Sequence, residues 1–144
     1  MSGAEWAAVL RIALGLWWLE SVRHKNFEAW TKRHAGITWA KSVAEKHPWS
    51  FVRRGFAAVV APRPSLMTWV VLGAEFSLGL GLTLGLLTPV ALIGSAVLSS
   101  IYFVLMITDD AEQGQNSMMF VIAVACLGLM AWQTWSLDAA LGLF

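Results

Sequence analysis

Four long apolar runs constrain the fold of this chain more than any other feature. Residues 4–22, 67–87, 89–108 and 117–136 each come close to the ~20 residues that a helix needs to cross ~30 Å of hydrocarbon. Only 13 % of the residues are charged, whereas soluble domains usually carry about 25 %. We therefore predict an all-α integral membrane protein, in which residues 1–144 form a single domain built on a four-helix transmembrane bundle.

A soluble four-helix bundle is the alternative. It would need a polar stripe along every helix, and residues 90–107 offer only Ser, Gly and Tyr for this purpose. The first apolar run has no basic segment before it, since Glu5 is the first charged residue, and no small-residue cleavage site after it. We therefore expect a retained helix rather than a signal peptide.

The charge distribution predicts how the chain is oriented. Nine of the ten Lys and Arg residues fall between Arg23 and Arg63, together with only Glu28 and Glu45, so this segment has a net charge of +7. Short basic loops stay on the cytoplasmic side of a membrane. We expect a multi-pass protein of the plasma membrane, with the basic interfacial segment 23–64 in the cytoplasm and both termini on the outer side.

An amphipathic helix is predicted inside the basic segment. Over residues 48–60 the apolar side chains recur at helical spacing, and prolines lie before and after this stretch. Such a helix lies naturally in the membrane interface, and residues 27–39 continue the same surface layer. It could form the surface to which a partner protein binds, or it could be an ordinary interfacial helix held by lipid head groups, and both interpretations stay open. The candidate docking residues are Trp49, Arg53, Arg54 and Phe56.

Small residues in the second apolar run predict close helix packing. Gly73, Ser77, Gly81 and Gly85 recur every four residues, and such lines let helix backbones approach each other in membranes. Glu75 begins a neighbouring line that we also expect to face inward.

Two charged residues lie near the middle of predicted spans. Arg11 and Glu75 each lie two residues before the middle of an apolar run, and the two helices are antiparallel. This places them about 6 Å apart along the axis at 1.5 Å per residue. Because an unpaired charge in mid-bilayer costs ~3 kcal/mol or more, we expect an intramembrane pair between Arg11 and Glu75. The pair could lock the bundle, or form a proton relay or the polar end of a ligand cavity.

A second polar cluster follows the first apolar run. Glu20, Arg23 and His24 share one helix face with Trp17. A titratable imidazole beside a carboxylate and an aromatic ring suits a quinone head group. The alternative is an interfacial cluster whose charged ends reach toward the head groups.

The chain lacks several motifs of redox enzymes. All three histidines lie outside the apolar runs, Cys126 is the only cysteine, and there is no Gly-rich nucleotide loop. We therefore expect no metal site, no covalently held cofactor and no nucleic-acid partner. A non-covalently bound quinone is the candidate cofactor.

The sequences "RIALGLWWLES" and "GAEFSLGLGLTLGLLTP" resemble the DoxX/DoxD family of small four-helix membrane proteins. The resemblance is strongest over residues 62–96, and the residues that match recurrent family positions are Arg11, Gly15, Glu75, Gly79 and Thr88. Pro89 departs from the family pattern, which often has a basic residue there. The resemblance implies a membrane subunit linked to redox metabolism, since relatives belong to a thiosulfate:quinone oxidoreductase or associate with sulfur-transfer or superoxide-handling enzymes.

Three functions are compatible with these features. The first is an accessory or anchoring subunit of a quinone-linked redox assembly, in respiration or in sulfur or oxidative-stress metabolism, with membrane lipid and a larger redox enzyme as partners. The second is a catalytic oxidoreductase subunit that binds quinone itself. The third is a small proton or solute permease, for which four helices leave little room unless the chain forms a homo-oligomer.

Overall fold

The computed structural model describes all 144 residues, and the all-α prediction is confirmed. The chain forms eight helices and no strands. Two of these helices, α5 and α6, are long and apolar enough to cross a membrane. The helices are α1 (Gly3–His24), α2 (Phe27–Arg33), α3 (Ala35–Glu45), α4 (Ser50–Val59), α5 (Pro64–Leu84), α6 (Thr88–Leu105), α7 (Asp110–Gly128) and α8 (Leu137–Leu141).

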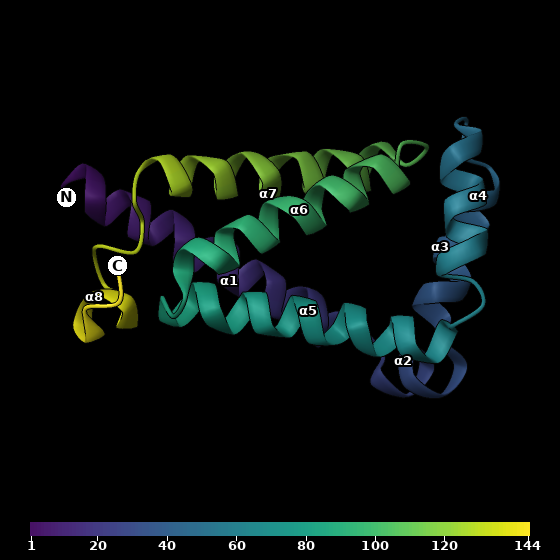
Figure 1. Ribbon diagram of the computed structural model, residues 1–144, viewed down its shortest axis with the longest axis horizontal. Helices are drawn as coiled ribbons and strands as arrows, with labels where there is room; N and C mark the ends of the chain where they lie inside the picture. The colour runs from purple at the N-terminus through teal and green to yellow at the C-terminus, as the bar shows by residue number, and fades with distance from the viewer.

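The four long helices form two pairs that diverge from one end of the molecule. Helix α1 packs mainly on α5, and α6 packs mainly on α7, while the contacts between the pairs are fewer. Figure 1 shows α5 and α6 meeting at their connecting turn and separating toward the other end, where α3 and α4 lie across the opening. Residues of helices α1 to α7 line a cavity in this region.

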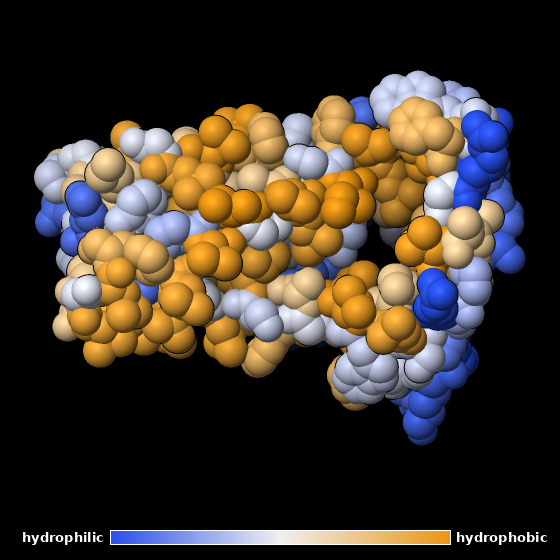
Figure 2. All heavy atoms as spheres, viewed as in Figure 1, coloured by the Kyte–Doolittle hydropathy of each residue, from blue (hydrophilic) through white to orange (hydrophobic).

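The core of the bundle lies where the two pairs are close together. Its fully buried side chains include Leu14 and Trp18 from α1, Leu82 from α5 and Leu92 from α6. The indole Nε1 of Trp18 donates a hydrogen bond of 2.8 Å to the hydroxyl of Ser95. Large apolar side chains also cover much of the outer surface of the long helices (Figure 2), as expected for helices that face lipid.

The end of the chain differs from the predicted helix over 117–136. Helix α7 begins at Asp110, because the side chain of Asp109 accepts a hydrogen bond of 3.2 Å from the backbone N–H of Glu112. It ends at Gly128, and residues 129–136 form turns in which Met130 and Trp135 have positive φ values of 51° and 49°. The predicted start at residue 117 is therefore wrong, since this residue lies inside α7.

The basic segment contains three helices where one amphipathic helix was predicted. The amide oxygen of Asn26 caps α2, and His34, with a left-handed φ of 52°, joins α2 to α3. Helix α4 lies within the predicted range, and its Phe56 is buried against Ala40 and Ala44 of α3. Phe56 is therefore not available for docking, because the third helix, which the sequence pattern did not reveal, covers it. The other candidate docking residues, Trp49, Arg53 and Arg54, are exposed.

The predicted packing line of α5 does not form the contact with α1. A Cβ atom on Gly73 would meet no other atom within 4 Å, and Ser77 is exposed. The neighbouring line is the one that packs, because a Cβ on Gly79 would lie 2.7 Å from the side chain of Leu19. Of the predicted line, Gly81 and Gly85 contact other elements, near the turn between α5 and α6.

Candidate functional site: a carboxylate cluster in an apolar cavity

The carboxylate of Glu75 is at the centre of a buried hydrogen-bond cluster. Its side chain is 2 % exposed and forms an ion pair with the ammonium of Lys25. The hydroxyl of Ser21 donates to Oε2 at 3.2 Å, and the hydroxyl of Tyr102 donates to Oε1 at 2.9 Å. Three long helices therefore contribute to the cluster, together with the residue that follows α1.

Lys25 reaches Glu75 because α1 stops one residue earlier. Lys25 is the C-cap of this helix, with extended backbone angles, and its side chain turns back along the last helical turn. Its Nζ donates to the carbonyl of Ser21 at 3.2 Å and to the hydroxyl of Ser21 at 2.9 Å. The same Nζ lies 4.9 Å from the centre of the Trp30 ring, within the range of a cation–π contact. The ammonium therefore donates three hydrogen bonds and lies beside an aromatic ring.

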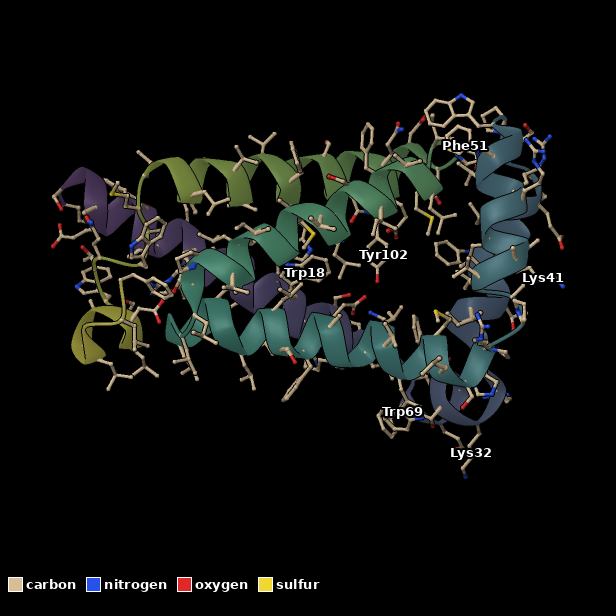
Figure 3. All side chains as sticks on the ribbon, in the orientation of Figure 1. Trp18, Lys32, Lys41, Phe51, Trp69 and Tyr102 are labelled. Atoms are coloured by element: carbon tan, nitrogen blue, oxygen red, sulfur yellow. The ribbon has the colours of Figure 1, made fainter.

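The cluster lies on the wall of a cavity of about 820 Å³. This volume falls in the range of roughly 300 to 1,000 Å³ that is usual for small-molecule sites, which are mostly apolar with a few polar groups. Figure 2 shows the hollow between the long helices and the α3–α4 pair, with hydrophobic residues above and below it, and Figure 3 shows Tyr102 projecting into this space. Aromatic residues of five helices line it: Trp17, Trp18, Trp30, Trp39, Phe56 and Tyr102.

The predicted pair between Arg11 and Glu75 is wrong. The guanidinium of Arg11 lies beside Gly85, whereas Ser21 is the residue of α1 that contacts Glu75. Ten residues of α1 separate Arg11 from Ser21, which is about 15 Å at 1.5 Å per residue. The prediction aligned the midpoints of the two apolar runs, but the helices are staggered, because α5 begins at Pro64 within the surface layer.

Arg11 satisfies the backbone where α7 ends early. Its guanidinium donates to the carbonyl of Ala131 at 3.0 Å and to the carbonyl of Trp135 at 2.6 Å. Both acceptors belong to the non-helical segment 129–136. On the same side of the molecule, the carboxylate of Asp138 accepts 2.7 Å hydrogen bonds from the N–H groups of Leu87 and Thr88. Arg11 and Asp138 thus hold the C-terminal segment on the bundle, and the carboxylate cluster lies elsewhere.

The predicted head-group cluster of Glu20, Arg23 and His24 forms on the outer surface. Arg23 Nε donates to Glu20 at 2.6 Å, and His24 Nε2 lies 2.9 Å from the same carboxylate. The hydrogen bond with Glu20 raises the pKa of Arg23 above its usual value. All three side chains are largely exposed, and none of them lines the large cavity. Only Trp17, the fourth predicted member, lines it.

His47 connects the surface layer to the bundle, which the sequence did not indicate. Its imidazole is fully buried; Nδ1 accepts a hydrogen bond of 3.1 Å from the N–H of Trp49, and Nε2 lies 2.8 Å from the carbonyl of Val104. A backbone N–H must donate and a carbonyl must accept, so the proton of the ring is on Nε2. Residues 45–49 are thereby fixed to the end of α6.

Sequence reasoning also missed Lys25 and Tyr102. Tyr102 is the only tyrosine of the chain and lies within an apolar run, where a buried hydroxyl needs a partner. The position of this tyrosine could therefore have indicated a buried polar site. The structure brings no three His, Cys, Asp or Glu side chains together in an arrangement that could hold a metal ion.

The chain matches no protein-family model, no curated protein and no solved structure. The resemblance to the DoxX/DoxD family therefore stays a hypothesis that depends on the quoted motifs.

Proposed function

We propose that this protein is a four-span membrane subunit that binds a lipid-soluble redox carrier of the quinone class in the cavity beside Glu75. It serves there as an accessory component of a larger redox assembly. The observation that carries this proposal is the position of the Glu75 cluster, a hydrogen-bonding group on the wall of a large, mostly apolar cavity. A flat aromatic head group with polar substituents and an apolar tail matches both parts of such a site.

Four spans are supported by the lengths of the long helices. Helices α1, α5, α6 and α7 have 22, 21, 18 and 19 residues, which correspond to about 27 to 33 Å and thus to the hydrocarbon thickness of a bilayer. In this arrangement helices α2 to α4 form an interfacial layer on the cytoplasmic side, where their Lys and Arg residues meet anionic head groups. Both termini then lie on the outer side.

A lipid-soluble ligand is favoured because the cavity is bordered by lipid-facing helices. Val70 of α5 and Ile101 of α6 line the cavity and are also largely exposed on the outer surface. Both side chains are apolar, so a hydrocarbon tail can pass between the separated ends of α5 and α6 without meeting a polar group. The resemblance to the DoxX/DoxD family supports the same class of ligand.

We assign the electron-transfer chemistry to a partner enzyme. The side chains around Glu75 can hold a head group and accept or donate a proton, and the sequence carries no nucleotide-binding loop and no cysteine cluster. The partner is a larger redox enzyme, for which the exposed basic layer with Arg53 and Arg54 provides the cytoplasmic surface. Mild solubilisation should recover the chain with that enzyme in stoichiometric amounts, and a chain purified alone would contradict the accessory role.

Quinone binding is tested with the purified protein in lipid nanodiscs. A decyl-substituted benzoquinone or its quinol is titrated while tryptophan fluorescence is recorded, since Trp17 and Trp18 line the cavity. We expect saturable quenching that Glu75→Gln weakens at least tenfold. Glu20→Gln is the matched control, because this carboxylate lies outside the cavity, and it should leave binding unchanged. Absence of saturable quenching with both forms of the ligand would refute the proposal.

A further inference from the structure

The Glu75 cluster has already used its hydrogen-bond donors. All three N–H groups of Lys25 are directed to partners, two on Ser21 and one on Glu75. The hydroxyl protons of Ser21 and Tyr102 are both directed to the carboxylate of Glu75. A carbonyl ligand that approached this cluster would find no donor unless one of these bonds broke.

Two oxygen atoms of the Glu75 cluster can still accept a hydrogen bond. The phenolic oxygen of Tyr102 donates to Glu75 and accepts no hydrogen bond, although a hydroxyl oxygen has two lone pairs. Oε1 of Glu75 accepts only from Tyr102, and an ionised carboxylate offers about four acceptor positions on its two oxygens. A ligand that donates a hydrogen bond therefore fits the cluster as it stands.

The net charge of the cluster also favours a neutral ligand that donates a hydrogen bond. Glu75 and Lys25 compensate each other, so the cluster has no positive charge left to attract an anionic head group. A phosphate would also approach the carboxylate directly, which is unfavourable in a buried site. A neutral hydroxyl group has neither disadvantage.

We infer that the site selects the hydroxyl form of its redox carrier, the quinol, over the carbonyl form, the quinone. This inference rests on the proposed function and names the substrate class of the same cavity. One quinol hydroxyl donates to Glu75 Oε1 or to the oxygen of Tyr102. Asn116, which lines the cavity from α7, has an amide that both donates and accepts, so it does not favour either form. At the Glu75 cluster itself the free polar atoms are acceptors only, and a site that hydrogen-bonds a ligand hydroxyl discriminates against the analogue that lacks it.

The test compares three ligands with the same decyl tail in nanodiscs, under anaerobic conditions. They are the benzoquinol, the benzoquinone, and the dimethyl ether of the quinol, which keeps the ring and loses both donors. We expect the quinol to bind at least about tenfold more tightly than the other two, because a hydrogen bond to a charged group contributes at least the free energy that corresponds to a factor of ten. This comparison uses the unaltered chain and depends on no variant.

Tyr102→Phe supplies the second measurement. It removes the phenolic acceptor and also the hydroxyl that donates to Oε1 of Glu75, so the quinol should still be preferred, now through Oε1 alone. Phe103→Leu on the same helix, whose side chain does not line the cavity, should leave the preference of the unaltered chain unchanged. Equal affinities, or tighter binding of the quinone, would overturn the selectivity while leaving the proposed function intact. If none of the three ligands binds, the proposed function itself fails, and this inference fails with it.

Discussion

Arg11 and Glu75, the buried charged residues of the long helices, should act independently, and a double-mutant cycle on these two residues tests this. The perturbations are Arg11→Met and Glu75→Gln, each of which removes a charge and keeps a side chain of similar length. In the structure about 15 Å of helix separates the levels of the two side chains, and they share no partner. Sites that far apart usually add within about 0.3–0.5 kcal/mol.

The magnitude expected for Arg11→Met follows from its two hydrogen bonds. The carbonyls of Ala131 and Trp135 lose their donor, and a hydrogen bond to a charged group contributes about 1.5–3 kcal/mol. Removal of a buried charge offsets part of this loss, because burial of the guanidinium is itself unfavourable. We expect the free energy of unfolding to fall by about 2–5 kcal/mol, with the largest increase in amide exchange at residues 129–141.

The assay is reversible unfolding in mixed detergent micelles, followed by far-UV circular dichroism for the parent, both single variants and the double variant. The coupling energy between Arg11 and Glu75 should lie within experimental error of zero. A second cycle, with Lys25→Met and Glu75→Gln, is the positive control, and its coupling should exceed about 0.5 kcal/mol because this pair is in contact. A coupling of 1 kcal/mol or more between Arg11 and Glu75 would refute the separation of the two charges.

Three further variants test other parts of the fold. Asp138→Ala should cost about 1–2 kcal/mol in thermal unfolding, because the cap of α6 is lost, and Asp138→Asn should recover part of it. Gly15→Ala should destabilise by about 1–3 kcal/mol, since its Cβ would lie 2.6 Å from the backbone nitrogen of Thr83; Gly73→Ala, which meets open space, should be neutral or slightly stabilising by the same measurement. His47→Phe removes both ring hydrogen bonds and should increase amide exchange in α3 and α4, with little change at α8.

The sequence was sufficient to predict the four long helices, but it did not predict all of the short helices or the axial positions of the long helices relative to one another. Apolar runs and proline positions predict the long helices to within a few residues, except for α7, which begins at Asp110 and ends at Gly128 instead of spanning residues 117–136. After Gly128 the apolar pattern continues over residues 129–136, although the backbone is no longer helical. Hydrophobicity alone therefore does not show where α7 ends. Arg11 did indicate the change, because a buried guanidinium needs hydrogen-bond acceptors, and a non-helical segment provides carbonyl groups that are free to accept.

The candidate site was predicted in part, for a similar reason. Glu75 stands out as a charge within an apolar run, but its partner depends on the axial stagger of α1 and α5. That stagger arises because α5 begins inside the surface layer, and no local pattern in the sequence reports it. Tyr102 approaches Glu75 from a third helix, and Lys25 comes from a chain segment whose direction depends on where α1 ends.

The surface layer formed by helices α2 to α4 contributes directly to the candidate site. Lys25 lies at the junction between α1 and α2, and the ring of Trp30 covers its ammonium group. Trp30 in turn packs against Gly36 of α3, where any side chain would overlap the indole ring. At the other side of the cavity His47 holds the α3–α4 turn to α6. The partner of the Glu75 carboxylate is therefore positioned by the same helices that cover the cavity, so displacement of the layer would expose the cavity and weaken the ion pair together.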